Sequence, residues 1–164
     1  MHPLFPENAV RQGADLVIHS LHKTLPAPTQ TALLHVQGDR VDRRRLRRLL
    51  AVYQTSSPSY VLMAGIDRCV GLLEREKDRL FGELAGHLDW FRRETGNLEL
   101  LRLPKSDDPS KILISAEGAG LTGLEIQKFL REEAHLELEM AAGSYALALA
   151  SVGDDREGFV RLAA

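Results

Sequence analysis

The sequence predicts an α/β fold, in which short strands and amphipathic helices follow one another along 164 residues. Three observations predict it. The apolar run at residues 14–18 is typical of a buried strand, and residues 60–94 repeat apolar side chains with a helical period. Residues 97–164 alternate strand-like and helix-like segments, which suits a small two-layer α+β domain. We therefore expect three parts, at residues 1–60, 61–96 and 97–164.

The N-terminal elements surround one lysine. Residues 1–13 carry loop-forming residues, and the stretch 7–12 within them could form one or two helical turns. Segments 14–18 and 31–36 are typical of short strands. The loop between these strands holds Lys23, so the lysine is expected at the end of a buried strand.

A helix is predicted from about residue 43 to residue 54, because Asp42 can cap it and its leucines and Tyr53 share one face. The other face is rich in arginine, and this cluster is the one candidate for nucleic-acid binding. No aromatic residues are interleaved with it and the net charge is negative, so a solvated or subunit-contact face is favoured. We assign it no function. The arginines are Arg40, Arg43, Arg44, Arg45, Arg47 and Arg48.

Residues 60–94 predict one long helix or two consecutive ones, ending at Gly96. Gly71 and Gly82 could interrupt it. The single cysteine, Cys69, falls among its apolar positions and excludes an internal disulfide. We interpret Cys69 as a small core residue in a reducing compartment.

The C-terminal elements follow at short intervals. A polar loop and several turn residues separate them. In order, the predicted elements are strands at 98–103 and 111–116, a helix at 124–133, strands at 136–140 and 145–152, and a helix after residues 153–155.

Residues 118–123 spell G-x-G-x-x-G between a predicted strand and a predicted helix, which is the pattern of a dinucleotide-binding turn. A dehydrogenase-type half-domain is therefore one alternative. A second interpretation is structural, because Thr122 and Glu125 have the spacing of a capping box and the glycines would simply turn the chain. We favour the second, since a lone motif of this kind is weak.

Composition is that of an ordinary globular protein. Hydrophobic residues make up 44% and charged residues 27% of the chain, and the formal net charge is -2, which attracts neither nucleic acid nor an anionic membrane. The N-terminus lacks the pattern of a signal peptide, and no apolar run approaches the length of a membrane span. We expect a cytoplasmic protein without nucleic-acid or membrane partners.

Lys23 is the strongest candidate for chemistry. A lysine forms a Schiff base with an aldehyde only as a neutral amine, which requires partial desolvation or a nearby cation. Ser20 and His22 bring a hydroxyl and an imidazole beside it, and both could donate to a phosphate monoester. Other interpretations are weaker: His19 and His22 lack further metal ligands, and Ser20 lacks a nucleophile elbow, so no metal site is predicted.

The segment from Ser20 to Ala32 resembles the cofactor-lysine segment of the bacterial ornithine/lysine/arginine decarboxylases, which are pyridoxal-phosphate enzymes of the aspartate-aminotransferase fold. The shared residues are Ser20, the pair His22-Lys23 and the later Thr29-Gln30-Thr31-Ala32. The resemblance extends over residues 13–155. Departures from the family pattern fall at Ile18, Pro26 and Pro28.

This resemblance implies a partial fold type I pyridoxal-phosphate transferase, comprising the end of the large domain and an α+β small domain. Lys23 would hold pyridoxal 5'-phosphate covalently, Ser20 and His22 would bind its phosphate, and Lys23 or His22 would return a proton to the substrate. Ser56 and Ser57 are weaker cofactor-binding candidates, together with Tyr60. Their segment resembles one that reaches the neighbouring subunit's phosphate, although Ser57 could equally cap the helix that follows.

The implied reaction is decarboxylation of arginine, lysine or ornithine to the amine and carbon dioxide, by a homo-oligomer that is a dimer or larger. In that family the aspartate at the cofactor's ring nitrogen and the group that stacks on the ring lie upstream of the lysine. Those positions would precede Met1, and the chain also stops before the family's usual C-terminal region. The alternative is therefore a non-catalytic truncated fragment of such an enzyme.

Overall fold

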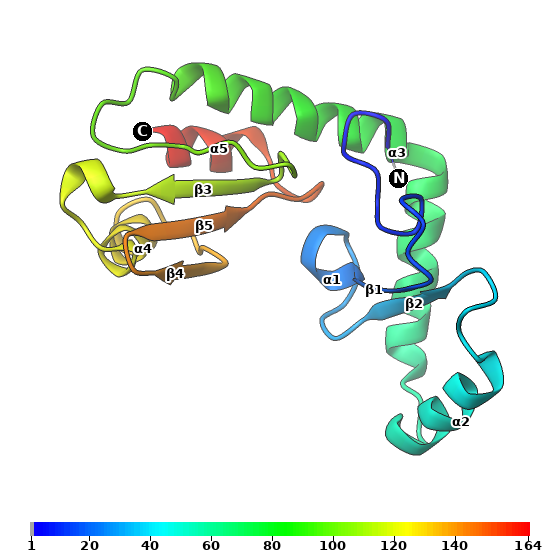
Figure 1. Ribbon diagram of the computed structural model, residues 1–164. Coiled ribbons are helices and arrows are strands. Elements are labelled where there is room, and N and C mark those ends of the chain that lie inside the picture. Colours follow the sequence, from blue (N-terminus) through cyan, green and yellow to red (C-terminus); the bar gives the residue numbers. More distant parts are fainter. Residues whose placement is uncertain (1) are drawn as a thin grey trace. The chain divides into compact units, whose positions relative to one another are not determined.

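The computed structural model describes residues 2–164, and these residues form the α/β arrangement that the sequence predicts (Figure 1). They divide into two compact units, residues 7–77 and residues 2–6 with 78–164. The predicted boundaries at residues 60 and 96 stay a prediction, since the division into compact units falls inside one helix. The elements are β1 (Leu16–Ser20), α1 (Leu21–Thr24), β2 (Ala32–Val36), α2 (Arg43–Tyr53), α3 (Tyr60–Glu94), β3 (Lys111–Ser115), η1 (Glu117–Ala119), α4 (Gly123–Glu132), β4 (Met140–Ala142), β5 (Tyr145–Leu149) and α5 (Arg156–Ala163).

The first unit contains an antiparallel pair of strands, β1 and β2, in which Leu16 lies opposite Val36 and Ser20 opposite Ala32. The strand begins two residues later than predicted. Ala14 is taken out of the ladder because its carbonyl accepts from the side chain of Gln37 at 2.9 Å. Its amide donates to a turn in the preceding segment, which forms turns instead of the helix that 7–12 could have made.

The helix α2 confirms its predicted cap and apolar face. The carboxylate of Asp42 accepts from the amides of Arg44 and Arg45 at 2.9 and 3.0 Å, which satisfies two of the donors at the helix start. Within the described chain no residue of α2 is buried. Its arginines between residues 43 and 48 are exposed, as expected for a solvated face.

The predicted helical connection is one continuous helix of 35 residues, α3. Gly71 and Gly82 do not interrupt it. A helical glycine costs about 1 kcal/mol relative to alanine, and burying one leucine side chain returns more than that. Leu84 and Leu88 on the same helix are 4% and 2% exposed.

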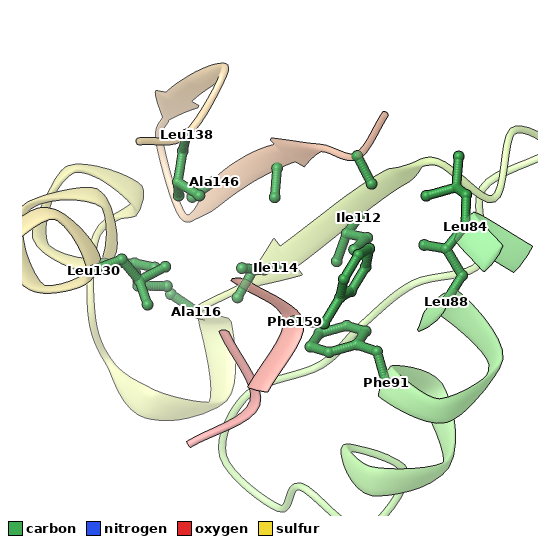
Figure 2. Packing of buried hydrophobic residues seen from close by; sticks show 13 residues of the cluster. Leu84, Leu88, Phe91, Ile112, Ile114, Ala116, Leu130, Leu138, Ala146 and Phe159 are labelled. Carbon is green, nitrogen blue, oxygen red and sulfur yellow. The ribbon is translucent and has the colours of Figure 1, made fainter. Parts of the chain in front are cut away.

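The second unit is built on a three-stranded antiparallel sheet in the order β3-β5-β4. The alternating burial of β3 directs Ile112 and Ile114 into the core. Figure 2 shows Phe91 of α3 and Phe159 of α5 beside Ile112, and their ring centroids are 6.3 Å apart. The core thus joins the sheet to residues of α3, α4 and α5.

Two predicted strands of this unit are wrong in position. Residues 98–103 form a single bridge, in which Arg102 and Ser115 exchange backbone hydrogen bonds of 3.1 and 2.8 Å. The strand predicted at 136–140 is β4, which starts at Met140. Gly143, at φ +53°, turns the chain directly from β4 into β5, so the hairpin sets where β4 lies.

The dinucleotide-binding alternative is wrong, because both strand pairs of this sheet, β3 with β5 and β4 with β5, are antiparallel, whereas that fold requires neighbouring strands to be parallel. The glycines serve close packing instead. A Cβ on Gly118 would stand 2.6 Å from the carbonyl oxygen of Leu100, and one on Gly123 would stand 2.6 Å from the carbonyl carbon of Tyr145. Thr122 and Glu125 form the predicted capping box.

Within residues 2–164, no helix has the length and apolar character needed to cross a membrane.

Candidate functional site

Lys23 lies in α1, a single helical turn that directly follows β1 in the first unit. The sequence predicted a loop there. The turn closes because the amide of Leu25 donates to the carbonyl of Leu21 at 2.9 Å, and the buried side chain of Leu21 anchors it. Ser20 ends β1 and occupies the N-cap position of the turn without a side-chain cap hydrogen bond. It lies three residues before Lys23, and both residues are exposed.

His22 is held by the residue that directly precedes the second strand. Its Nδ1 lies 2.9 Å from the carbonyl oxygen of Thr31. A carbonyl oxygen only accepts hydrogen bonds, so Nδ1 carries the hydrogen and donates it. The other ring nitrogen, Nε2, is therefore an acceptor when the imidazole is neutral and a donor only when the ring is protonated. The resemblance assigned His22 to the phosphate, and it is Nε2 of the charged ring that could serve there.

Thr31 is the residue that the sequence interpretation missed. It is 3% exposed, and its carbonyl accepts both from His22 and from the amide of Leu21, at 3.0 Å. Its own Oγ1 and amide donate to the carbonyl of Pro28, at 2.7 and 3.2 Å. A polar residue at the start of an apolar strand was the available signal, because a buried hydroxyl needs a partner.

The expectation of a dry lysine is not met within this unit, because Lys23 is exposed. The preceding strand is exposed as well: Leu16 and Ile18 on one face of β1 are 46% and 70% accessible. A two-stranded ribbon leaves a face open unless another layer covers it, so the apolar pattern of residues 14–18 did not guarantee burial. Residues 7–77 hold the turn that carries Lys23 in place and leave this residue exposed.

Ser56 and Ser57 are exposed in the segment between α2 and α3. The amide of Ser57 donates to Oγ1 of Thr55 at 3.1 Å. Ser57 is not the cap of the helix: α3 begins at Tyr60, and Oγ of Ser59 accepts from the amide of Leu62 at 3.3 Å.

A pair of histidines lies near the site on the strands. The rings of His19 and His35 are 4.7 Å apart, and burial, followed by the charge of His35, lowers the pKa of His19. His19 therefore favours its neutral form. No group of three or more metal-ligating side chains gathers anywhere in residues 2–164.

Comparison with known proteins identifies the family of the chain. The family model for the Orn/Lys/Arg decarboxylase major domain matches residues 2–99. An arginine decarboxylase of Bacillus subtilis is 29% identical over 171 residues, covering 98% of this chain and 35% of that protein. An arginine decarboxylase of Bacillus anthracis is 28% identical, covering 93% of this chain and 33% of that protein. The chain thus spans about a third of the length of these relatives.

Solved structures show the same fold. The lysine decarboxylase of Francisella novicida superimposes with a TM-score of 0.75 at 21% identity, over 90% of this chain and 26% of that one. The constitutive lysine decarboxylase of E. coli gives 0.66 at 19% identity, over 88% and 26%. The chain therefore has part of the α/β fold of these enzymes. With the family model matching more than half of its residues, the chain belongs to the Orn/Lys/Arg decarboxylase family.

Proposed function

We propose that this chain carries the cofactor lysine of a pyridoxal-phosphate-dependent decarboxylase that converts arginine, lysine or ornithine into the amine and carbon dioxide. The observation that supports it most is the junction of β1 and α1, where four consecutive residues bring an amine, a hydroxyl and an imidazole, from Lys23, Ser20 and His22. Relatives named as arginine decarboxylases and structural neighbours named as lysine decarboxylases support the reaction class.

The donor set fits pyridoxal 5'-phosphate. Nζ of Lys23 can bond to the aldehyde carbon, while Oγ of Ser20 and Nε2 of His22 can donate to the phosphate. Bound there, the cofactor supplies an electron sink for the electron pair that remains when carbon dioxide leaves. These three residues would hold and orient it.

The hydrogen bond from His22 to Thr31 suggests different roles for the two candidate proton donors, His22 and Lys23. Because Nδ1 is committed to Thr31, donation to a phosphate uses the one proton on Nε2. The proton on Nε2 is then engaged in the hydrogen bond to the phosphate. Nζ of Lys23 would therefore be the group that returns a proton to the alpha carbon of the substrate. His22 is thus the phosphate ligand and Lys23 the catalytic acid in this proposal.

A homo-oligomer would complete the site. Lys23 is exposed in the first unit, so the low-dielectric surroundings that lower the pKa of a catalytic lysine must come from further protein. Ser56 and Ser57 are exposed and project from an inter-helix segment, which leaves them accessible to a neighbouring copy's cofactor. We propose them as phosphate ligands in trans, in a dimer or larger assembly.

The test is to purify the chain, add pyridoxal phosphate, and follow the absorbance of the bound cofactor together with amine and carbon dioxide release from each of the three amino acids. The proposal predicts a bound band and turnover that are both lost in Lys23→Ala. Equal absorbance and equal turnover in Lys23→Ala and in the unmodified chain would show that Lys23 has neither role.

A second candidate is a non-catalytic chain, a truncated fragment that lacks cofactor-binding residues found elsewhere in the family. The exposure of Lys23 and the coverage of 35% of a relative's length favour it. The same experiment separates the two. A band without turnover indicates a partial site. The absence of both the band and turnover supports the fragment.

A further inference from the structure

We propose that Gly65 and Thr31 are positioning residues for His22, acting through Pro28, and that together they decide which imidazole nitrogen is presented to the phosphate. This proposal rests on the proposed role of the lysine turn. It concerns residues of the first unit alone, from α3, the loop after the lysine and the position directly before β2.

Gly65 of α3 lies against the loop that follows the lysine turn. A Cβ built on Gly65 would stand 2.5 Å from Cδ of Pro28 and closer still to Cγ. A proline ring cannot turn aside as the end of a long side chain can, because it is closed onto its own backbone. Any side chain at position 65 must therefore displace the loop or the helix.

Pro28 in turn fixes a tight turn. Its carbonyl accepts from the amide of Thr31, three residues on, and from Oγ1 of the same threonine. Gln30 between them has φ +76°, the left-handed value that the third position of a type II turn requires. Two hydrogen bonds thus join the last residue of the turn to the first. A shift of the Pro28 ring would move the Pro28 carbonyl, and with it Thr31.

Thr31 passes this placement to the imidazole. Its carbonyl binds Nδ1 of His22 at 2.9 Å and the amide of Leu21 at 3.0 Å, so one oxygen orients both the ring and the turn that carries Lys23. If this carbonyl moves, the ring loses the acceptor that selects the hydrogen on Nδ1. Without this acceptor, the neutral imidazole no longer favours the tautomer that carries its hydrogen on Nδ1 over the one that carries it on Nε2.

The chain supplies a matched pair of glycines for the test. Gly71 lies on the same helix, and a Cβ there would meet only the far end of the Arg75 side chain, at 3.4 Å. Gly65→Ala and Gly71→Ala therefore add the same methyl group to the same helix, and only the first meets the proline ring. Pro28→Ala should rescue Gly65→Ala, because it removes the atoms that the methyl would meet.

The first measurement needs no cofactor. Nitrogen NMR of the chain with isotope-labelled histidine, above the pH at which the ring is charged, reports which nitrogen of His22 is protonated. The proposal predicts hydrogen on Nδ1 in the unmodified chain and in Gly71→Ala. It predicts loss of that preference in Gly65→Ala and recovery in the Pro28→Ala/Gly65→Ala double variant. An unchanged His22 signal in a folded Gly65→Ala chain would overturn the proposal.

Thr31→Val gives a second route, should Gly65→Ala fail to fold. Valine keeps the shape of threonine but removes the hydroxyl bond to Pro28. The proposal predicts that His22 again loses its fixed proton position, whereas an unchanged His22 signal would refute the role of Thr31 and with it the proposed relay.

The second measurement is a titration with pyridoxal phosphate. Losing one hydrogen bond to a charged group lowers affinity by about tenfold or more, so Gly65→Ala should bind that much more weakly than Gly71→Ala. Equal affinities of the two variants would contradict the positioning role. If the unmodified chain binds no cofactor at all, the proposed function fails, while the NMR result on His22 still decides the inference.

Discussion

Thr122 and Glu125 bond to each other in both directions at the start of α4. The amide of Thr122 donates to Oε2 of Glu125 at 2.7 Å, and the amide of Glu125 donates to Oγ1 of Thr122 at 3.2 Å. Two helix-end amides are satisfied in this way, and α4 is held where the chain leaves the turn after β3.

The capping box makes α4 sensitive to acid. The backbone hydrogen bond from Thr122, followed by that from its hydroxyl, lowers the pKa of Glu125 below its ordinary value. A depressed folded pKa gives stability that is present above the ordinary glutamate pKa and is lost as pH falls through the folded pKa. We expect the thermal midpoint of the second unit to fall with acid, and less steeply in Glu125→Gln. Glu99→Gln, at an exposed position outside a helix, is the control, and equal slopes in all three proteins would contradict the prediction.

Gly123→Ala should strongly destabilise the second unit. The added methyl would overlap the backbone of Tyr145, which cannot swing away as a side chain can. Overpacking of this kind costs about 1–3 kcal/mol or more. Gly86→Ala is the matched control, since a Cβ there meets nothing within 4 Å and should stabilise α3 by up to about 1 kcal/mol. Denaturation followed by the fluorescence of Trp90 measures both, and similar midpoints for the two variants would refute the close approach.

Phe159→Ala tests the core. Phe159 is 4% exposed and lies between Phe91 and His87, with ring centroids 6.3 and 5.5 Å away. Truncation of a buried phenylalanine costs about 3–5 kcal/mol. Phe129→Ala removes the same atoms from a position that is 62% exposed, so the loss there should be well below half as large. Denaturant midpoints compare the two variants, and equal losses would mean that α5 does not seal this core.

Gln30→Gly should stabilise the loop that follows the lysine turn. A left-handed backbone costs an ordinary residue about 1–2 kcal/mol, and glycine avoids this strain. Glycine also loses more conformational entropy on folding, which offsets about 0.5–1 kcal/mol of the gain. A net gain of about 0.5–1 kcal/mol is expected at this φ of +76°. Slower amide exchange at Leu21 and Thr31 would report it. Gln30→Ala removes the same side chain without the backbone freedom, and if it slowed exchange as much, strain would not be the cause.

Local signals in the sequence predicted much of the fold. Asp42 before an amphipathic segment marked the start of α2, and the spacing of Thr122 and Glu125 marked the start of α4. Caps act within three residues, so the sequence displays them directly. The long apolar repeat likewise predicted α3.

Contacts between distant residues were not visible in the sequence. Pro28 and Gly65 meet across 37 positions, and an apolar strand gave no sign that its outer face lies open. The position of Lys23 in a helical turn depends on Leu21 bonding to Thr31, the residue that directly precedes the next strand. The sequence therefore indicated which residues could form the site, while the bond that fixes His22 required the tertiary structure.

The central claim is that Lys23 is the residue that binds pyridoxal phosphate. Incubating the chain with pyridoxal phosphate, reducing with borohydride and mapping the labelled peptides tests it most directly, with the other lysines, Lys77, Lys105, Lys111 and Lys128, as internal controls. The account predicts that the label is concentrated on Lys23 and is lost from that peptide in Lys23→Arg. A label spread evenly over the lysines, or absent from Lys23, would contradict it.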